Sequence, residues 1–253
     1  MKDRSILIVG GNRGLGLELA NQYADAGKIV YATARHIPPL AGSKIHWISN
    51  FDITKEDAGN KIFVKYLDSQ IDLLIVCAGY FAKETLEGLD YDKEVAMYKT
   101  NAIGPTFLIS HLLRVKLLGS GSRIVLVSGE SGSIQLRHPE FGGGNYGGHG
   151  SKAALNMCGK LLANEFEKSH KGISVAMVHT GYLRKQNPDG TWETGGNNAL
   201  NPAEAATKLK EWITTSFDHT KNGEFWSIRG PDGIRTASLV LGDNLPTPLQ
   251  LPW

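Results

Sequence analysis

Two kinds of hydrophobic pattern alternate along the chain. Short, unbroken apolar runs such as Ile6-Leu7-Ile8-Val9 are typical of strands that are buried on both faces of a parallel sheet. Longer segments with apolar residues three and four positions apart are typical of amphipathic helices. We predict strands at residues 6–9, 28–34, 45–48, 71–77, 123–127, 173–178 and 224–228. We predict helices at residues 14–26, 54–69, 91–118, 150–169 and 202–217.

This alternation predicts an α/β fold, namely a Rossmann-like doubly wound parallel sheet of about seven strands with helices on both faces. Pro105 lies near the middle of the long helix 91–118, where it should kink the helix or open its hydrogen bonding. Residues 230–253 contain four prolines and little periodicity, so we expect a coil that wraps the surface. With no internal repeat or linker, residues 1–253 are predicted to form a single domain with this Pro-rich C-terminal tail, 230–253.

Composition favours a globular protein that binds small molecules. Of its 253 residues, 41% are hydrophobic and 21% are charged, and the 27 basic and 25 acidic residues are interspersed. A net charge of +2 without a basic face argues against nucleic acid or an anionic membrane as partner. No apolar run approaches a membrane span, and the first strand pattern starts almost at once, so we expect no signal peptide and a cytoplasmic location.

The cysteine content gives no indication of a disulfide framework or a metal site. Only Cys77 and Cys158 are present, and no Cys/His cluster has the spacing of metal ligands. We therefore expect no metal and a reducing compartment.

A glycine-rich turn joins the first strand to the first helix. Gly10, Gly14 and Gly16 would let the backbone turn tightly, approach a pyrophosphate and seat the helix close to the sheet. The N–H groups at the start of the helix would hold the phosphates. The turn therefore predicts a dinucleotide site, whose contacts also include the other residues of the turn, Asn12, Arg13 and Leu15.

The spacing G-x-x-x-G-x-G resembles the short-chain dehydrogenase/reductase family, although Val9 stands where that family usually has threonine. The resemblance extends to about residue 225. Asp52-Ile53-Thr54 resembles the D-V-T motif that contacts the adenine side of the cofactor. Ala78-Gly79 matches the second half of N-N-A-G, with Val76 and Cys77 in place of the asparagines. The resemblance implies further cofactor contacts from Asp52, Ile53, Cys77, Ala78, Gly79 and Gly181.

Part of the family's catalytic set is also present. Asn101, in T-N-A-I-G-P, matches the helix asparagine that holds a water in a proton relay. Lys152, in S-K-A-A-L-N, resembles the lysine that binds the nicotinamide ribose. The family's tyrosine lies four residues before that lysine, where this chain has Gly148, and Gly129 occupies the position of the substrate-binding serine.

Three residues are candidates to replace the missing groups. His149 lies three residues before Lys152, on nearly the same helix face. Tyr146 would reach the site only if its segment were not helical. Ser131 could replace the serine. Each also has a structural interpretation, in which His149 caps the helix, Tyr146 packs on the glycine loop and Ser131 makes turn hydrogen bonds.

Two arginines favour NADP(H) over NAD(H). NAD sites usually end the second strand with an acidic residue for the ribose hydroxyls, whereas Arg35 follows this strand and Arg13 lies in the glycine turn. Guanidinium groups of this kind suit a 2′-phosphate.

Three functions remain open at this point. The first is an NADPH-dependent reductase of a carbonyl, enone, imine or iminium in a small, natural-product-like substrate of secondary metabolism. The second is a non-redox cyclase, dehydratase or isomerase that uses a cavity left at Gly129 and Gly148. The third is a catalytically silent NADPH-binding protein. Because the family often pairs two long helices across a subunit interface, a homodimer or homotetramer is a further expectation.

Overall fold

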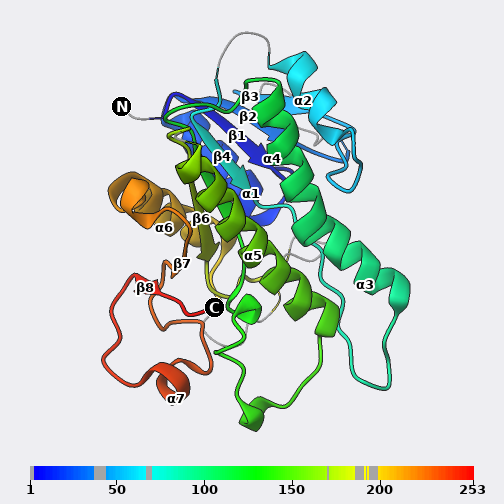
Figure 1. Ribbon diagram of the computed structural model, residues 1–253, viewed down its shortest axis with the longest axis vertical. Coiled ribbons are helices and arrows are strands. Elements are labelled where there is room, and N and C mark those ends of the chain that lie inside the picture. Colours follow the sequence, from blue (N-terminus) through cyan, green and yellow to red (C-terminus); the bar gives the residue numbers. More distant parts are fainter. Residues whose placement is uncertain are drawn as a thin grey trace.

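One eight-stranded sheet forms the centre of the molecule in the computed structural model, which describes residues 3–36, 44–66, 70–169, 171–185, 191, 193 and 199–253. The strand order is β3-β2-β1-β4-β5-β6-β7-β8 (Figure 1). All neighbouring strands are parallel except β7 and β8. The strands are β1 (Ser5–Val9), β2 (Ile29–Thr33), β3 (Ile45–Ile48), β4 (Leu73–Val76), β5 (Arg123–Val127), β6 (Ser174–His179), β7 (Glu224–Ser227) and β8 (Leu249–Gln250).

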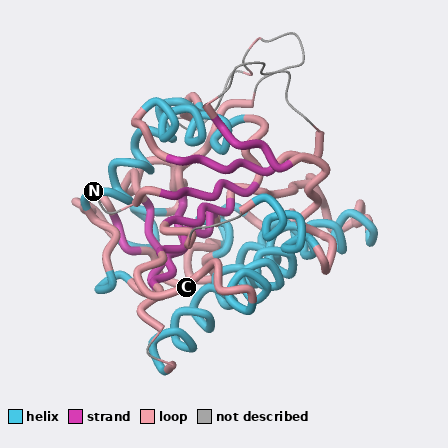
Figure 2. The backbone as a smooth tube through the Cα atoms, turned by 90° about the horizontal axis from the view of Figure 1, so that it is seen from above, coloured by secondary structure: helices cyan, strands magenta, loops and turns pink. Residues whose placement is uncertain are grey.

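Helices cover both faces of the sheet, as predicted (Figure 2). The helices α2, α4 and α5 pack on one face, and α1 and α6 pack on the other. Their bounds, with those of α3 and α7, are α1 (Gly14–Asp25), α2 (Ala58–Lys65), α3 (Tyr91–Tyr98), α4 (Gly104–Arg114), α5 (Tyr146–Lys168), α6 (Pro202–Thr215) and α7 (Ala237–Leu241).

Alternate residues of each central strand enter two separate hydrophobic cores. In β1, Leu7 and Val9 join the core beneath α4 and α5, whereas Ile6 and Ile8 join the core beneath α1 and α6. All four side chains are fully buried. The unbroken apolar run therefore follows from burial on both faces, with one helix layer for each set of side chains.

The C-terminal tail is more ordered than the predicted coil. Within residues 230–253 the chain forms α7 and then β8, which pairs antiparallel with β7 and raises the strand number from seven to eight. The Leu251 N–H donates to the Phe225 carbonyl at 2.7 Å, and the Trp253 ring stacks on Phe225. The tail thus satisfies backbone groups that β7 would otherwise present at the edge of the sheet.

The predicted long helix 91–118 is divided by a wide turn. A π-helical turn, Lys99–Ile103, separates α3 from α4, and α4 ends at Arg114, four residues early. Pro105 has no N–H to donate to the carbonyl of Asn101, so regular α-helical bonding cannot continue past this point. The predicted opening is therefore confirmed. Helix α2 is shorter than predicted, and residues 67–69 of that prediction lie outside the described part of the chain.

Helix α5 begins at Tyr146 rather than at the predicted Gly150. Glu84 causes the difference, because its Oε2 accepts a hydrogen bond from the Gly147 N–H at 2.8 Å. Asn145 precedes the helix in a left-handed conformation, with φ at 52°, and its carbonyl accepts the His149 N–H at 2.9 Å. Among the described residues, no helix is both long and apolar enough to cross a membrane.

Candidate active site

The glycine turn lies at the carboxyl end of β1, beside the corresponding ends of β2 and β4. Gly10 has a φ of 85°, and an added Cβ there would lie 2.7 Å from the Ala78 nitrogen, so only glycine fits between the two strands. Thr33 at the end of β2 accepts hydrogen bonds from the Gly10 and Gly11 N–H groups. Gly14 has a φ of 53° and open space where a side chain would project. This backbone fits the phosphates of a dinucleotide at the start of α1.

The residues predicted around the turn occupy different environments. Gly16 lies so close to the strand end that an added Cβ would meet the Gly10 carbonyl oxygen at 2.1 Å. Leu15 is buried in the core, Asn12 is half-buried, and Arg13 is exposed directly before α1.

Arg35 and Asp52, both predicted to contact the adenine half of the cofactor, follow β2 and β3 respectively. Arg35 follows β2 and is exposed. Burial raises the pKa of Asp52, but two hydrogen bonds from Thr54 to its Oδ1, with the Lys55 and Arg35 charges nearby, hold the pKa below its ordinary value. The carboxylate therefore stays ionised near Arg35. Ile53 is buried, and its carbonyl faces Gly104 so closely that a Cβ there would approach it to 2.4 Å.

Asn101 and Lys152 converge on Gly79 at the end of β4. An added Cβ at Gly79 would lie 3.5 Å from Asn101 Oδ1 and 3.9 Å from Lys152 Nζ. Lys152 Nζ donates to the Val127 carbonyl at 2.8 Å, at the end of β5. The Asn101 amide accepts the Tyr80 N–H, at 2.8 Å, and donates to the Tyr80 carbonyl and to Ser151 Oγ, both at 2.9 Å. The segments after β4 and β5, the π-helical turn and α5 thus bring together Asn101 and Lys152, the residues predicted for the proton relay and for the nicotinamide ribose.

Burial changes the acidity of two of these residues. It lowers the pKa of Lys152 from 10.5 to about 8, and the nearby Cys77 partly opposes this shift. It raises the pKa of the Cys77 thiol to about 12, although Lys152 acts against that shift. Cys77 is therefore protonated at neutral pH and poorly suited to be a nucleophile.

Ser131 lies beside Gly129, where the resemblance predicts a serine. The two residues belong to the end of β5 and a following single turn of 3₁₀ helix, Glu130–Gly132. An added Cβ at Gly129 would lie 3.1 Å from Ser131 Oγ. The Ser131 hydroxyl therefore occupies part of the space into which a side chain at position 129 would project.

Phe81 covers Gly148, so the side-chain space at this position is not an empty cavity. An added Cβ at Gly148 would lie 2.9 Å from Cε2 and 3.0 Å from Cδ2 of the Phe81 ring. Gly148 itself is buried. The expected enlargement of the site at residues 129 and 148 is thus reduced by a hydroxyl at one position and by an aromatic ring at the other.

Tyr146 and His149 lie in the first turn of α5. Tyr146 is exposed and turns back over the glycine-rich loop, with its hydroxyl 3.1 Å from the position of an added Cβ at Gly143. This placement matches the packing interpretation, since the helix starts early enough to include Tyr146. His149 is half-buried one turn before Lys152, and burial, together with the nearby Arg137, lowers its pKa.

A polar network beside His149 was not predicted from the sequence. The buried carboxylate of Glu130 forms an ion pair with Arg137 and accepts a hydrogen bond from the Tyr182 hydroxyl at 2.9 Å. Burial and the Glu130 charge raise the pKa of Tyr182 to about 12. In the sequence, only position could have indicated these two residues, because Glu130 directly follows Gly129 and Tyr182 directly follows Gly181. Gly181 has a φ of 81° and contacts the Arg229 side chain.

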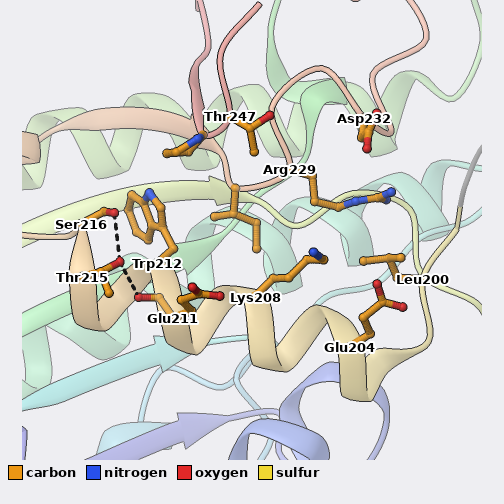
Figure 3. A pocket seen from close by; sticks show the side chains of 12 residues that line it. Leu200, Glu204, Lys208, Glu211, Trp212, Thr215, Ser216, Arg229, Asp232 and Thr247 are labelled. Carbon is orange, nitrogen blue, oxygen red and sulfur yellow. Dashed lines mark hydrogen bonds between the residues drawn. The ribbon is translucent and has the colours of Figure 1, made fainter.

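A separate pocket of about 390 Å³ lies between α6 and the C-terminal segment (Figure 3). Its wall includes Trp212 and Ser216 at one end and Glu204, Lys208 and Arg229 at the other. None of the predicted site residues lines it. Its mixture of acidic and basic side chains indicates no single class of ligand.

Comparison with known proteins agrees with this geometry. The sequence model described as short chain dehydrogenase matches residues 4–193, which include the glycine turn, Asn101 and Lys152. The chain belongs to the short-chain dehydrogenase family. The prediction of an oxidoreductase is thereby confirmed at the level of the family. An uncharacterized oxidoreductase of Schizosaccharomyces pombe is 31% identical over 189 residues, covering 70% of this chain and 72% of that protein.

Other known proteins are similar in sequence or in fold. The 1-hydroxy-2-glutathionyl-2-methyl-3-butene dehydrogenase of Rhodococcus sp. is 26% identical over 212 residues, covering 81% of this chain and 88% of that protein. The carbonyl reductase Sniffer of D. melanogaster superposes with a TM-score of 0.75 at 23% identity, covering 99% of this chain and all of that one. An NADPH-bound carbonyl reductase from chicken fatty liver has a TM-score of 0.74 at 21% identity, covering 90% and 97%. These two structures establish the fold.

Proposed function

We propose that this short-chain dehydrogenase is an NADPH-dependent reductase of a carbonyl, enone, imine or iminium group in a small, natural-product-like substrate. The convergence of Asn101 and Lys152 on Gly79 carries the proposal, because it places an ammonium group beside the loops expected to hold the nicotinamide ribose. Bound NADPH would supply the hydride. Gly10, Gly14 and Gly16 would hold its phosphates, and Arg13 with Arg35 would select the 2′-phosphate.

Proton supply differs from the usual arrangement of the family, since Gly148 has no hydroxyl to donate. Among the candidates, His149 is favoured over Tyr146, because it lies one turn before Lys152 whereas the Tyr146 hydroxyl faces the Gly143 loop. With its pKa lowered, His149 is neutral at pH 7 and acts through its ring N–H, as an orienting donor or a relay group. Ser131 supplies a second hydroxyl beside Gly129.

An iminium substrate depends least on the missing acid. Its carbon accepts hydride without prior protonation. General acid catalysis typically contributes roughly 10²–10⁴-fold to the rate, and an iminium does not lose this factor when the acid is missing. We therefore expect faster reduction of a cyclic iminium than of a ketone with the same carbon skeleton.

The deciding experiment follows NADPH oxidation and product formation with such a matched iminium and ketone pair. His149→Ala should lower kcat for the ketone by about tenfold or more, whereas Tyr146→Phe should leave it nearly unchanged. Product formed without net NADPH consumption would replace the reductase with a non-redox cyclase, dehydratase or isomerase. Absence of any product across a wide panel would favour a silent NADPH-binding protein.

We also propose that the chain forms a homodimer or homotetramer through α4 and α5. Both helices present large exposed apolar side chains, including Phe107 and Leu161.

A further inference from the structure

Phe81 is an aromatic residue whose ring lies against the catalytic helix. It lies beside Gly148, one helical turn before Lys152, where an added Cβ would be 2.9 Å from the ring. Phe81 comes two residues after Gly79, the residue on which Lys152 and Asn101 converge. The ring therefore borders the position at which the nicotinamide and the substrate are expected to meet.

The backbone on both sides of Phe81 is held in place. Tyr80 exchanges two hydrogen bonds with the Asn101 amide, at 2.8 and 2.9 Å. The Ala82 N–H contacts the Met97 sulfur at 3.4 Å. Further along, Glu84 is bonded through its backbone to Asn145 and through its carboxylate to Gly147. These contacts fix the point from which the ring projects.

Gly148 can cover only one face of the Phe81 ring, and the residue is 55% exposed. The same loop also exposes Leu86 and Leu89. An exposed phenylalanine on a fixed backbone, beside a catalytic lysine, offers a flat apolar surface that a side chain at position 148 would otherwise displace. Aromatic rings bind other planar groups by offset stacking, and they attract cations to their faces.

We propose that Phe81 is a specificity-determining residue, on whose exposed ring a planar conjugated or aromatic substrate stacks. This inference rests on the proposed reductase function and narrows its substrate class. The small volume of Gly148 is required, because a larger residue would push the ring away from the helix. The planar surface also suits an iminium conjugated with an aromatic ring, whose positive charge the Phe81 face would attract.

The test compares two ligands with the same carbon skeleton, 2-acetonaphthone and its fully saturated decahydro analogue. Calorimetric titration of each into the protein loaded with NADP⁺ measures binding without turnover. We expect the wild-type protein to bind the planar ketone more tightly. Phe81→Leu should weaken binding of 2-acetonaphthone by roughly fivefold to tenfold and leave that of the saturated analogue within about twofold. Phe81→Tyr should retain the preference, because the ring is kept.

Phe63→Ala is the matched control, since Phe63 lies on α2 and is 50% exposed. It should change neither affinity. Equal affinities of the wild-type protein for the two ketones would overturn the proposed stacking on Phe81. Equal losses of affinity for both ketones in Phe81→Leu would do the same. NADPH oxidation with the same ketones separates the two proposals. Tighter binding of the planar ketone without its reduction would contradict the reductase function but support stacking on Phe81. Reduction without tighter binding of the planar ketone would support the reductase function and contradict the stacking.

Discussion

Lys152 is a candidate site residue whose protonation depends on its place in the fold. Burial lowers its pKa from 10.5 to about 8, so the ammonium form predominates only below that pH. Between these two values the unfolded chain holds more protons at this side chain than the folded chain does. The contribution of Lys152 to the free energy of unfolding therefore rises with pH between about 8 and 10.5. Below about pH 8 the destabilisation caused by burying the charged ammonium group is fully present.

The first prediction concerns cofactor binding by Lys152. We expect NADPH affinity to decrease as the pH rises through about 8, because the ammonium group loses the charge and proton that would bind the ribose. Lys152→Met should bind NADPH more weakly at neutral pH and lose most of this pH dependence. Fluorescence titration on both sides of pH 8 measures the effect, with Lys168→Met at the exposed end of α5 as the control. An unchanged pH profile in Lys152→Met would contradict the assigned role.

The second prediction concerns the choice of cofactor by Arg35. A hydrogen bond to a charged group contributes about 1.5–3 kcal/mol, so Arg35→Ala should weaken NADPH binding by roughly tenfold to a hundredfold. NADH binding should change little, because NADH has no 2′-phosphate. Arg114→Ala, which removes an exposed arginine at the end of α4, is the control. Equal affinities of the wild-type protein for NADPH and NADH would refute the preference.

At the scale of elements, the start of α5 depends on a residue from a distant loop. Glu84 is only 4% exposed, and its carboxylate accepts the Gly147 N–H in the first turn of the helix. A carboxylate at this position satisfies an otherwise unpaired donor and interacts favourably with the helix dipole. The same contact orients the turn that carries His149, one turn before Lys152. Glu84 thus positions the start of the helix that carries the proposed catalytic residues.

The third prediction is that Glu84→Ala lowers the free energy of unfolding by about 1–3 kcal/mol, because Gly147 loses its acceptor in a buried environment. Denaturant unfolding gives the change. Asp90→Ala is a matched control, since Asp90 accepts the Lys93 N–H at the start of α3 but lies in an exposed position. We expect it to lower the free energy of unfolding by less than Glu84→Ala does, because solvent can replace the lost acceptor. If Glu84→Ala were as stable as Asp90→Ala or more stable, the buried Glu84 carboxylate would not stabilise the start of α5 as proposed.

At the scale of the whole molecule, α4 and α5 lie side by side over the same face of the sheet (Figure 1). Four large apolar residues on these helices and on the π-helical turn directly before α4 are 49–60% exposed, namely Ile103, Phe107, Met157 and Leu161. A group of exposed apolar residues of this kind is typical of a surface that another molecule covers. A second copy of the chain, paired helix to helix, would bury it.

The fourth prediction follows from this surface. Sedimentation equilibrium should show an oligomer for the wild-type protein, and Phe107→Asp combined with Leu161→Asp should yield monomers. Buried charges at the centre of an apolar interface are strongly unfavourable. The control introduces an aspartate at the exposed Phe63 of α2, outside this surface, and should retain the oligomer. A monomeric wild-type protein would exclude the interface.

Local sequence pattern by itself determined the alternation of strands and helices in a parallel sheet and the glycine turn, and the motifs shared with the family pointed to Asn101 and Lys152. Strand burial, helix amphipathicity and glycine conformation all leave a signal within a few residues. The opening of the long helix at Pro105 was predictable for the same reason, because the missing N–H is a property of one residue.

Only the tertiary structure decided how the site is completed. Glu84 extends α5 from a distance of 63 residues, and Tyr182 meets Glu130 across 52 residues. Phe81 lies beside Gly148 and Ser131 beside Gly129, so the enlargement expected from the two missing side chains is reduced. β8 likewise forms because the edge of β7 is available to the C-terminal residues. Such contacts depend on which distant segments the packed sheet brings together. The hydrophobic periodicity of a local segment does not predict them.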